Sequence, residues 1–149
     1  MTMFILTWNP DKSLNDDWWE SEIDQFSKGN GTTIDCWSTG SRASEIEVGD
    51  TGILLRQKRE RGILAVGHFT GKWHRRPDWN ESAGSIDYAG FEVSQAVSVA
   101  DRLRTEILLE EVPEVSWNNL MSSGTRADQQ GADRVMELWD SYWSQLHGS

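Results

Sequence analysis

The stretch TGILLRQKRERGILAVGHFTG, residues 51–71, contains two apolar runs separated by the charged tetrapeptide KRER. Each run is short, rich in aliphatic residues and bounded by glycine, a pattern typical of β-strands. Two such runs joined by a few polar residues predict a β-hairpin with a basic tip at Lys58, Arg59 and Arg61. The Gly-Asp pair that begins at Gly49 predicts a tight turn into the first strand.

Further strands are expected on both sides of the hairpin. The run MFILTW (3–8) is short and apolar, which suits a buried strand, and TTIDCWST (32–39) is rich in β-branched residues. The run IDYAGFEVSQAVSV (86–99) predicts one or two more strands. Between the hairpin and this run, residues 72–85 are expected to form a long loop.

Helices are expected near the two ends of the chain. One would begin after Asn15 or Asp16, either of which can cap it, and residues 127–146 would form the second. Strands in the middle with helices near both ends predict an α+β fold with a strongly curved or barrel-like sheet. No domain boundary is visible, so a single domain is expected over residues 1–149. The apolar residues at helical spacing are Trp18, Trp19, Ile23 and Phe26 in the first helix and Val135, Leu138, Trp139, Tyr142 and Leu146 in the second.

Several features of the composition limit the function. Cys36 is the only cysteine, which excludes an internal disulfide and fits a reducing cytoplasm. His68, His74 and His147 lack the spacing of metal ligands, so no zinc site and no other cofactor is expected. No apolar run approaches the roughly 20 residues of a membrane-spanning helix, and the first residues lack the basic start of a signal peptide.

Charge is distributed unevenly along the chain. The net charge of −10 argues against a nucleic-acid partner. Residues 56–76, however, contain seven of the 14 Lys and Arg residues and only one acidic residue. A solvated hairpin tip would explain such a cluster, and so would a phosphate-binding patch on an otherwise acidic protein.

Known catalytic motifs are missing from the sequence. It has no G-x-S-x-G motif, no P-loop and no G-x-G-x-x-G motif. Cys36 is a possible nucleophile, but a lone cysteine on a strand is more often a small core residue. A binding function is therefore preferred, with an enzyme acting through Cys36 as an alternative.

Nine tryptophans in 149 residues are an unusually large number, and they indicate either a Trp-rich core or an aromatic binding site. A core position is expected for Trp18, Trp139 and Trp143 on the helices and for Trp8 on the first strand. A binding role stays open for the tryptophans at strand ends or in loops, next to polar or basic residues. These are Trp37, Trp73, Trp79 and Trp117.

An aromatic cage built on Trp37 is energetically reasonable for a flipped base. Stacking a base on one aromatic side chain is worth roughly 1–3 kcal/mol, so two walls would offset the few kcal/mol that flipping costs. Burying a methyl group adds only about 0.8 kcal/mol. A reader of modified bases must therefore also use a closed shape and polar groups, which the small residues Ser38, Thr39 and Gly40 would let the backbone provide.

Five motifs occur in order before the closing helix: FILTWNP, CWSTGSR, VGDTGILLRQKRERGILAVGHFTG, YAGFEV and SSGTR. Over nearly the whole chain they resemble the EVE domain, a member of the PUA-like superfamily that is close to the YTH domain. The resemblance implies a small PUA-like curved β-barrel of about five to six strands with flanking helices. It also implies a modified-base reader. YTH domains hold methylated adenine of RNA in an aromatic cage, and some EVE domains, fused to HNH nucleases in modification-dependent restriction enzymes, sense modified cytosine in DNA by flipping it.

The resemblance also assigns roles to single residues. Trp37 matches the first cage tryptophan, Trp79 matches the second, and Trp73 competes with Trp79 for that role. Tyr88 is a candidate third wall, and Arg126 matches a basic residue that contacts the nucleic-acid backbone in YTH domains. The expected base-binding residues are Trp37, Ser38, Thr39, Trp79, Tyr88 and Trp73. The expected contacts to the nucleic-acid backbone are Arg42, Lys58, Arg59, Arg61, Lys72, Arg75, Arg76 and Arg126.

The leading interpretation is a non-catalytic module that binds DNA and flips 5-methyl- or 5-hydroxymethylcytosine into the cage. Cleavage would then belong to a fused or associated HNH-type nuclease in a restriction system. The acidity of the chain and its long expected loop depart from the YTH pattern, so a reader of modified RNA stays open as an alternative. A further alternative is a domain whose cage holds a small molecule or a protein segment.

Overall fold

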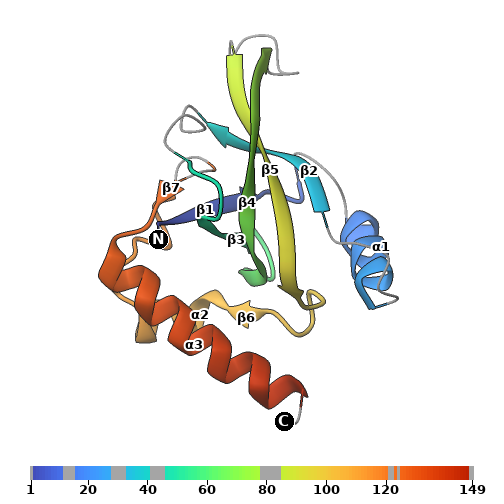
Figure 1. The fold of residues 1–149 in the computed structure, drawn as a ribbon. Coiled ribbons are helices and arrows are strands. Elements are labelled where there is room, and N and C mark those ends of the chain that lie inside the picture. Colours follow the sequence, from blue (N-terminus) through green and yellow to red (C-terminus); the bar gives the residue numbers. More distant parts are fainter. Residues whose placement is uncertain are drawn as a thin grey trace.

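In the computed structural model, three helices flank one mixed sheet of seven strands (Figure 1). The structure describes residues 2–11, 16–27, 33–40, 46–77, 85–120, 123 and 125–147. The strands are β1 (Met3–Trp8), β2 (Thr33–Gly40), β3 (Thr51–Arg56), β4 (Gly62–Pro77), β5 (Ser85–Ala96), β6 (Leu103–Arg104) and β7 (Thr125–Arg126). The helices are α1 (Asp16–Ser27), α2 (Thr105–Glu111) and α3 (Gln129–His147).

The sheet is strongly curved. Its strand order is β2-β5-β4-β3-β1-β7, with β6 paired to β4. β1 runs parallel to β3, and the other recorded pairs are antiparallel. The curvature brings β1 into contact with β2, which is four places away in the order. β6 and β7 have only two residues each, too few to give a sequence pattern, which is why the sequence predicts a smaller number of strands.

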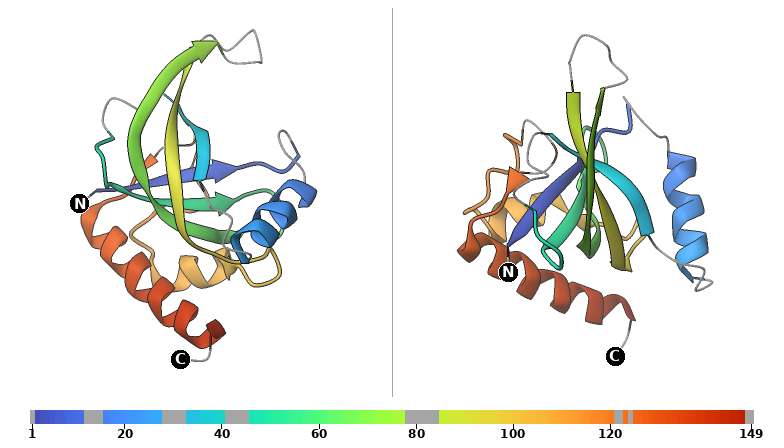
Figure 2. Two further views of the ribbon diagram at one scale, coloured as in Figure 1. Left: turned by 45° about the vertical axis from the view of Figure 1, so that its right-hand side comes forward. Right: turned by 45° about the horizontal axis from the view of Figure 1, so that its top comes forward.

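Both faces of the central strands are buried. In β1, Met3 and Ile5 belong to a cluster with α2 and α3, whereas Phe4, Leu6 and Trp8 belong to a second cluster that includes α1. Figures 1 and 2 show α1 beside β2 and, on another side of the sheet, α2 and α3 together. A strand covered on both faces reads as a continuous apolar run, which explains why MFILTW does not alternate.

The closing helix α3 packs against the first cluster through its predicted apolar stripe. Val135 and Trp139 are completely buried, whereas Leu146 at the far end of the stripe is exposed. The Tyr142 hydroxyl donates a hydrogen bond to the backbone oxygen of Asp101 at 2.7 Å. Burial, helped by the charge of Asp101, raises the pKa of Tyr142. No helix within the described residues combines the length and the apolar character needed to cross a membrane.

Helix α1 contributes its tryptophan pair to the second cluster. Trp19 is buried, and its indole N–H donates to the backbone oxygen of Val97 at 2.9 Å. Trp18 is half-buried and packs edge-on against Trp8, with ring centroids 5.3 Å apart. The helical spacing in the sequence therefore identified the side of the helix that packs on the sheet.

The loop expected over residues 72–85 is wrong for residues 72–77, which continue β4, and for Ser85, which begins β5. This segment pairs with β5 from Trp73 opposite Ala89 to Pro77 opposite Ser85. Its basic residues conceal the strand in the sequence, because charged side chains interrupt an apolar pattern. Figure 1 shows β4 and β5 continuing together beyond the rest of the sheet.

Candidate nucleic-acid interface

Ala89 of β5 has a tryptophan opposite it on each side. Trp37 of β2 pairs with Ala89 on one side, and Trp73 of β4 pairs with it on the other. Directly opposed residues of antiparallel strands belong to the same face of a sheet. One tryptophan therefore lies on each side of a small residue. We call these three positions the tryptophan row.

The tryptophan row lies directly beyond the aromatic core. Phe91 follows Ala89 by two residues on β5 and shares its face, because strand positions alternate between faces. Phe91 is completely buried, with its ring centroid 5.5 Å from that of Phe69. Phe69 in turn packs edge-on against Phe4 at 6.0 Å. On the face of β5 that carries Phe91, Ala89 is the next position along the strand. The tryptophan row therefore borders the cluster of phenylalanines.

An extra residue in β2 brings Trp37 into the row. Between Phe91 and Ala89, β5 advances two residues, whereas β2 advances three between Ile34 and Trp37. With regular pairing Cys36 would stand opposite Ala89 instead. A one-residue excess of this kind is a β-bulge, which re-aims the residues that follow it.

A larger irregularity in β4 brings Trp73 into the row. β4 advances four residues between Phe69 and Trp73, against the same two residues of β5. With regular pairing Gly71 would occupy this position. Bulges are over-represented next to functional sites, and here both neighbours of β5 are irregular between the same two rows.

The next row along the strands consists of Ser38, Tyr88 and His74. Because successive positions of a strand alternate between faces, this row belongs to the face opposite to that of the tryptophan row. Thr39 lies at a second irregularity of β2, between Ser38 and Gly40. The register therefore unites Trp37 with Trp73 and places Ser38 and Tyr88 together in the adjacent row.

Two of the predicted contacts, Trp79 and Arg42, lie outside the described residues. The backbone positions of Lys72, Arg75 and Arg76 lie on the part of β4 that extends with β5. The roles of these residues in binding stay predictions.

The hairpin tip gives its basic residues different surroundings. Arg59 forms an ion pair with Asp11. One terminal nitrogen of Arg61, Nη2, donates to Oδ1 of Asn118 at 2.9 Å. Lys58 is exposed and has a left-handed backbone conformation, with φ of 74°. Two of the three predicted cations thus already have partners within the chain.

Arg56 is completely buried, although it belongs to the basic stretch of the sequence. Its guanidinium carbon lies 4.9 Å from the ring centroid of Trp8, and its Nε donates to the backbone oxygen of Arg59 at 3.1 Å. A cation over an aromatic face is attracted by the ring. Arg56 therefore stabilises the hairpin and is not accessible to a nucleic acid.

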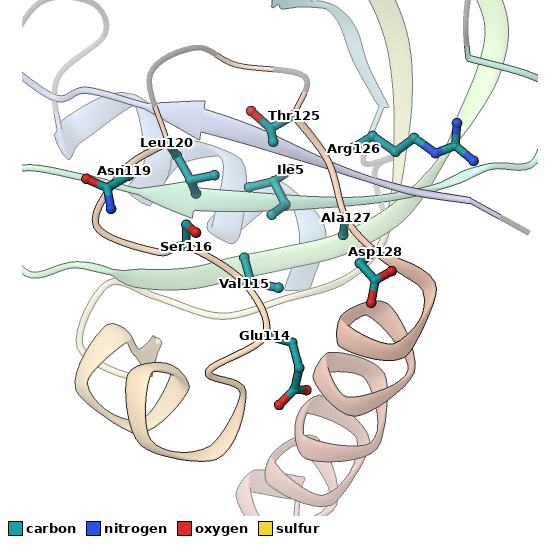
Figure 3. Close-up of a pocket in the computed structure, with 10 residues that line it drawn as sticks. All are labelled: Ile5, Glu114, Val115, Ser116, Asn119, Leu120, Thr125, Arg126, Ala127 and Asp128. Atoms are coloured by element: carbon teal, nitrogen blue, oxygen red, sulfur yellow. The ribbon is translucent and has the colours of Figure 1, made fainter.

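Arg126 is exposed on β7, opposite Phe4 of β1. It borders a cavity of about 400 Å³ between these strands and residues 114–120. Figure 3 shows the Arg126 side chain extending away from Asn119 and Leu120 on the other side of the cavity. Its guanidinium can therefore meet a partner from solvent, and its contact with a nucleic-acid backbone stays a prediction.

Trp117 is a core residue, and the binding role that the sequence left open for it is wrong. It is 1% exposed, and its indole N–H donates to the backbone oxygen of Val112 at 2.9 Å. Its neighbours in the sequence, Ser116 and Asn118, are both exposed. This polar context made a buried tryptophan resemble a surface one.

The histidines are separated in the fold as well as in the sequence. His68 pairs with Thr51 in the β3–β4 hairpin, and the ring of His147 stacks on that of Trp143 at 3.9 Å in α3. Over the described part of the chain, no three His, Cys, Asp or Glu residues gather as metal ligands would.

Comparison with known proteins shows the fold. No protein-family model and no curated protein matches the sequence. Solved structures of similar fold include the human THYN1 protein in complex with DNA containing 5-methylcytosine, with a TM-score of 0.61, 11% identity, and coverage of 93% of this chain and 97% of that chain. The YTH domain-containing protein mmi1 in complex with RNA has a TM-score of 0.58 and 14% identity, over 99% and 87%. A hypothetical protein from Leishmania major has a TM-score of 0.55 and 9% identity, over 98% and 97%.

These neighbours confirm the α+β, PUA-like fold that the sequence motifs predict. The resemblance of the motifs to EVE and YTH domains is thereby confirmed at the level of the fold. Both complexes contain a nucleic acid, one a methylated DNA and the other an RNA.

Proposed function

We propose that this chain is a non-catalytic reader that binds nucleic acid and recognises a modified base. The observation that supports this proposal most directly is the tryptophan row, in which Trp37 and Trp73 flank Ala89 just beyond the aromatic core. The base would be flipped out of its strand and stacked between the two tryptophans. Trp79 is the alternative second wall.

The spacing of the strands suits a single planar base. Neighbouring strands lie about 4.8 Å apart, so two strands separated by a third are about 9.6 Å apart. A base in contact with a ring on each face needs about 7 Å between the rings, because contacting carbon atoms lie about 3.5 Å apart. Rings that lean toward one another over Ala89 would close the remaining distance. A small residue such as Ala89 would leave the space between the tryptophans open.

Modified cytosine in DNA is the favoured ligand, and 5-methyl- or 5-hydroxymethylcytosine would be the flipped base. The complex of THYN1 with methylcytosine-containing DNA supports this choice, whereas the mmi1 complex supports RNA as the alternative. We assign any cleavage to an HNH-type nuclease, fused or associated, so that the module serves a restriction system. We also propose that residues 1–149 act as one domain in the reducing cytoplasm, with which the single Cys36 agrees.

Matched oligonucleotides test the proposal. We expect the wild-type chain to bind a duplex with one modified cytosine at least fourfold more tightly than the same duplex with plain cytosine, since burying a methyl group alone contributes about 0.8 kcal/mol. Fluorescence anisotropy would measure both affinities. 2-Aminopurine placed next to the modified base would become brighter when that base leaves the stack. Equal affinity for the two duplexes would contradict the proposal, and tighter binding of the matched RNA would favour the alternative ligand.

Ala89 is expected to control access to the space between the tryptophans. The substitution Ala89→Leu adds three carbon atoms at the centre of the row and should weaken binding of the modified duplex by about five- to thirtyfold, or about 1–2 kcal/mol, as an overfilled site does. The matched control is Ser94→Leu, which adds a leucine at an exposed position of the same strand. Thermal unfolding would show that both variants fold. Unchanged affinity in Ala89→Leu would show that the base does not enter this space.

A further inference from the structure

A second cavity, of about 480 Å³, lies beside the hairpin tip. The tip precedes Gly62, the first residue of β4, whereas Trp73 lies near the other end of that strand. Eleven residues of extended strand span at most about 36 Å, which is about one turn of duplex DNA. The cavity is lined by none of the residues of the tryptophan row, and it lies within reach of the same nucleic acid.

The cavity offers hydrogen-bond donors, and among the described residues no Asp or Glu lines it. Lysine and arginine carry positive charge, and the amide groups of asparagine and glutamine add neutral donors. Such a lining suits an anion. Its polar members are Asn9, Gln57, Lys58, Arg61 and Asn118.

The guanidinium of Arg61 is held in place at the cavity wall. Its Nη2 donates to Oδ1 of Asn118 at 2.9 Å and to the backbone oxygen of Trp117 at 3.2 Å. Asn118 accepts this bond through its oxygen, so its amide nitrogen is the atom with which it would donate to a bound anion. The other guanidinium nitrogens of Arg61 bring further donors, since arginine has five N–H groups.

The backbone of the tip is strained and firmly tied. Lys58 and Glu60 both have positive φ angles, 74° and 46°, a conformation that is costly for residues other than glycine and is enriched at functional sites. The backbone nitrogen of Arg59 donates to the oxygen of Gln57 at 2.9 Å, and Arg56 binds the oxygen of Arg59. This arrangement holds Lys58 at the cavity, and no ion pair to the Lys58 ammonium is recorded among the described residues.

We infer that this cavity is a phosphate-binding site, in which Lys58 and Arg61 neutralise the phosphate and Asn118 donates to it. For a phosphate within a nucleic-acid strand, the inference rests on the proposed reader function. A free phosphate or nucleotide has the same chemistry and would use the same donors. Arg59 does not line the cavity, and its guanidinium is paired with Asp11.

The test compares two neighbouring residues that carry the same charge. In the chain of residues 1–149, Lys58→Gln and Arg59→Gln each remove one positive charge from the tip. Only Lys58→Gln is expected to reduce the salt dependence of duplex binding. The slope of the logarithm of the binding constant against the logarithm of the salt concentration should become shallower by about 0.9, which is the value for one phosphate contact. A fourfold rise in salt should then weaken this variant about 3.5-fold less than the wild type. Asn118→Asp, which puts a carboxylate into the cavity, should weaken binding as well.

Inorganic phosphate distinguishes the two sources of the ligand. If phosphate alone shifts the NMR signals of Lys58 and Asn118 at millimolar concentration and Lys58→Gln removes the shifts, the site takes a free phosphate. If only the duplex shows the Lys58 effect, the site takes a backbone phosphate. Equal loss of affinity in Lys58→Gln and Arg59→Gln, or no change of slope in Lys58→Gln together with no NMR shift by inorganic phosphate, would overturn the inference.

The same measurements separate this inference from the proposed function. A chain that does not prefer the modified duplex, but still loses one phosphate contact in Lys58→Gln, would refute the base reader and keep the phosphate site. A chain that keeps its preference for the modified base, with Lys58→Gln identical to wild type, would refute only the phosphate site.

Discussion

Replacing Gly67 by alanine is expected to lower the free energy of unfolding by about 3 kcal/mol or more, or to prevent folding. A Cβ atom on Gly67 would lie 2.0 Å from the backbone oxygen of Glu92. Neither group can turn away, because both belong to the backbone of the paired strands β4 and β5. Urea unfolding followed by tryptophan fluorescence would measure the loss.

Gly49 provides the control for this substitution. A Cβ at Gly49 would meet no atom within 4 Å, but the residue has a φ of +87°. Gly49→Ala should therefore cost only roughly 1–2 kcal/mol, from the backbone conformation alone. If Gly67→Ala were no more destabilising than Gly49→Ala, the close approach of β4 and β5 would not limit the fold.

Trp37→Ala is expected to remove the preference for the modified base and to lower the affinity for the modified duplex by about five- to 150-fold. This range corresponds to roughly 1–3 kcal/mol for stacking one base on one aromatic side chain. Trp73→Ala should have a similar effect, because the register gives it an equivalent place beside Ala89. The double variant should lose less than the sum of the two single losses if both rings hold one base.

Two further variants make this result specific. Trp143→Ala removes a half-buried tryptophan from α3, distant in sequence from the row, and should leave the affinity unchanged. Trp79→Ala separates the two candidate second walls. A full loss of discrimination in Trp79→Ala, with none in Trp73→Ala, would show that the second wall is not on β4. Retained discrimination in Trp37→Ala would refute the cage.

Local patterns predicted those parts of the fold that depend on local physics. The sequence predicts the hairpin of β3 and β4 because glycines and a charged tip bound its two aliphatic runs. The turn of a hairpin depends on a few neighbouring residues, so a local pattern can identify it. Trp139 could be assigned to the core because helical spacing fixes which face packs on the sheet, and it is completely buried. Of the adjacent pair in α1, the sequence favoured Trp18 as the core residue, whereas Trp19 is buried and Trp18 is half-buried.

The tryptophan row could not be predicted, because it depends on pairing between segments that are distant in the sequence. The register of β5 with its two neighbours includes extra residues in each of them, and no periodicity of a single strand reveals an extra residue in a pair. Trp37 was proposed from its place at a strand end and from the resemblance to a family, whereas Ala89 gave no signal. Prediction from charge has a similar limit. A count of basic residues in the sequence does not distinguish a buried guanidinium, such as that of Arg56, from an exposed one.

The position of β1 has a consequence for the order in which the molecule assembles. This strand precedes the other strands of the sheet in the sequence, yet it lies between β3 and β7, and its Phe4 pairs with Arg126 near the other end of the described chain. Pairing over such a sequence separation is slow, because the entropy of loop closure is lost before the contacts form. The sheet therefore closes only after nearly all of these residues have left the ribosome. Until then, β1 has an unpaired edge that is prone to aggregation.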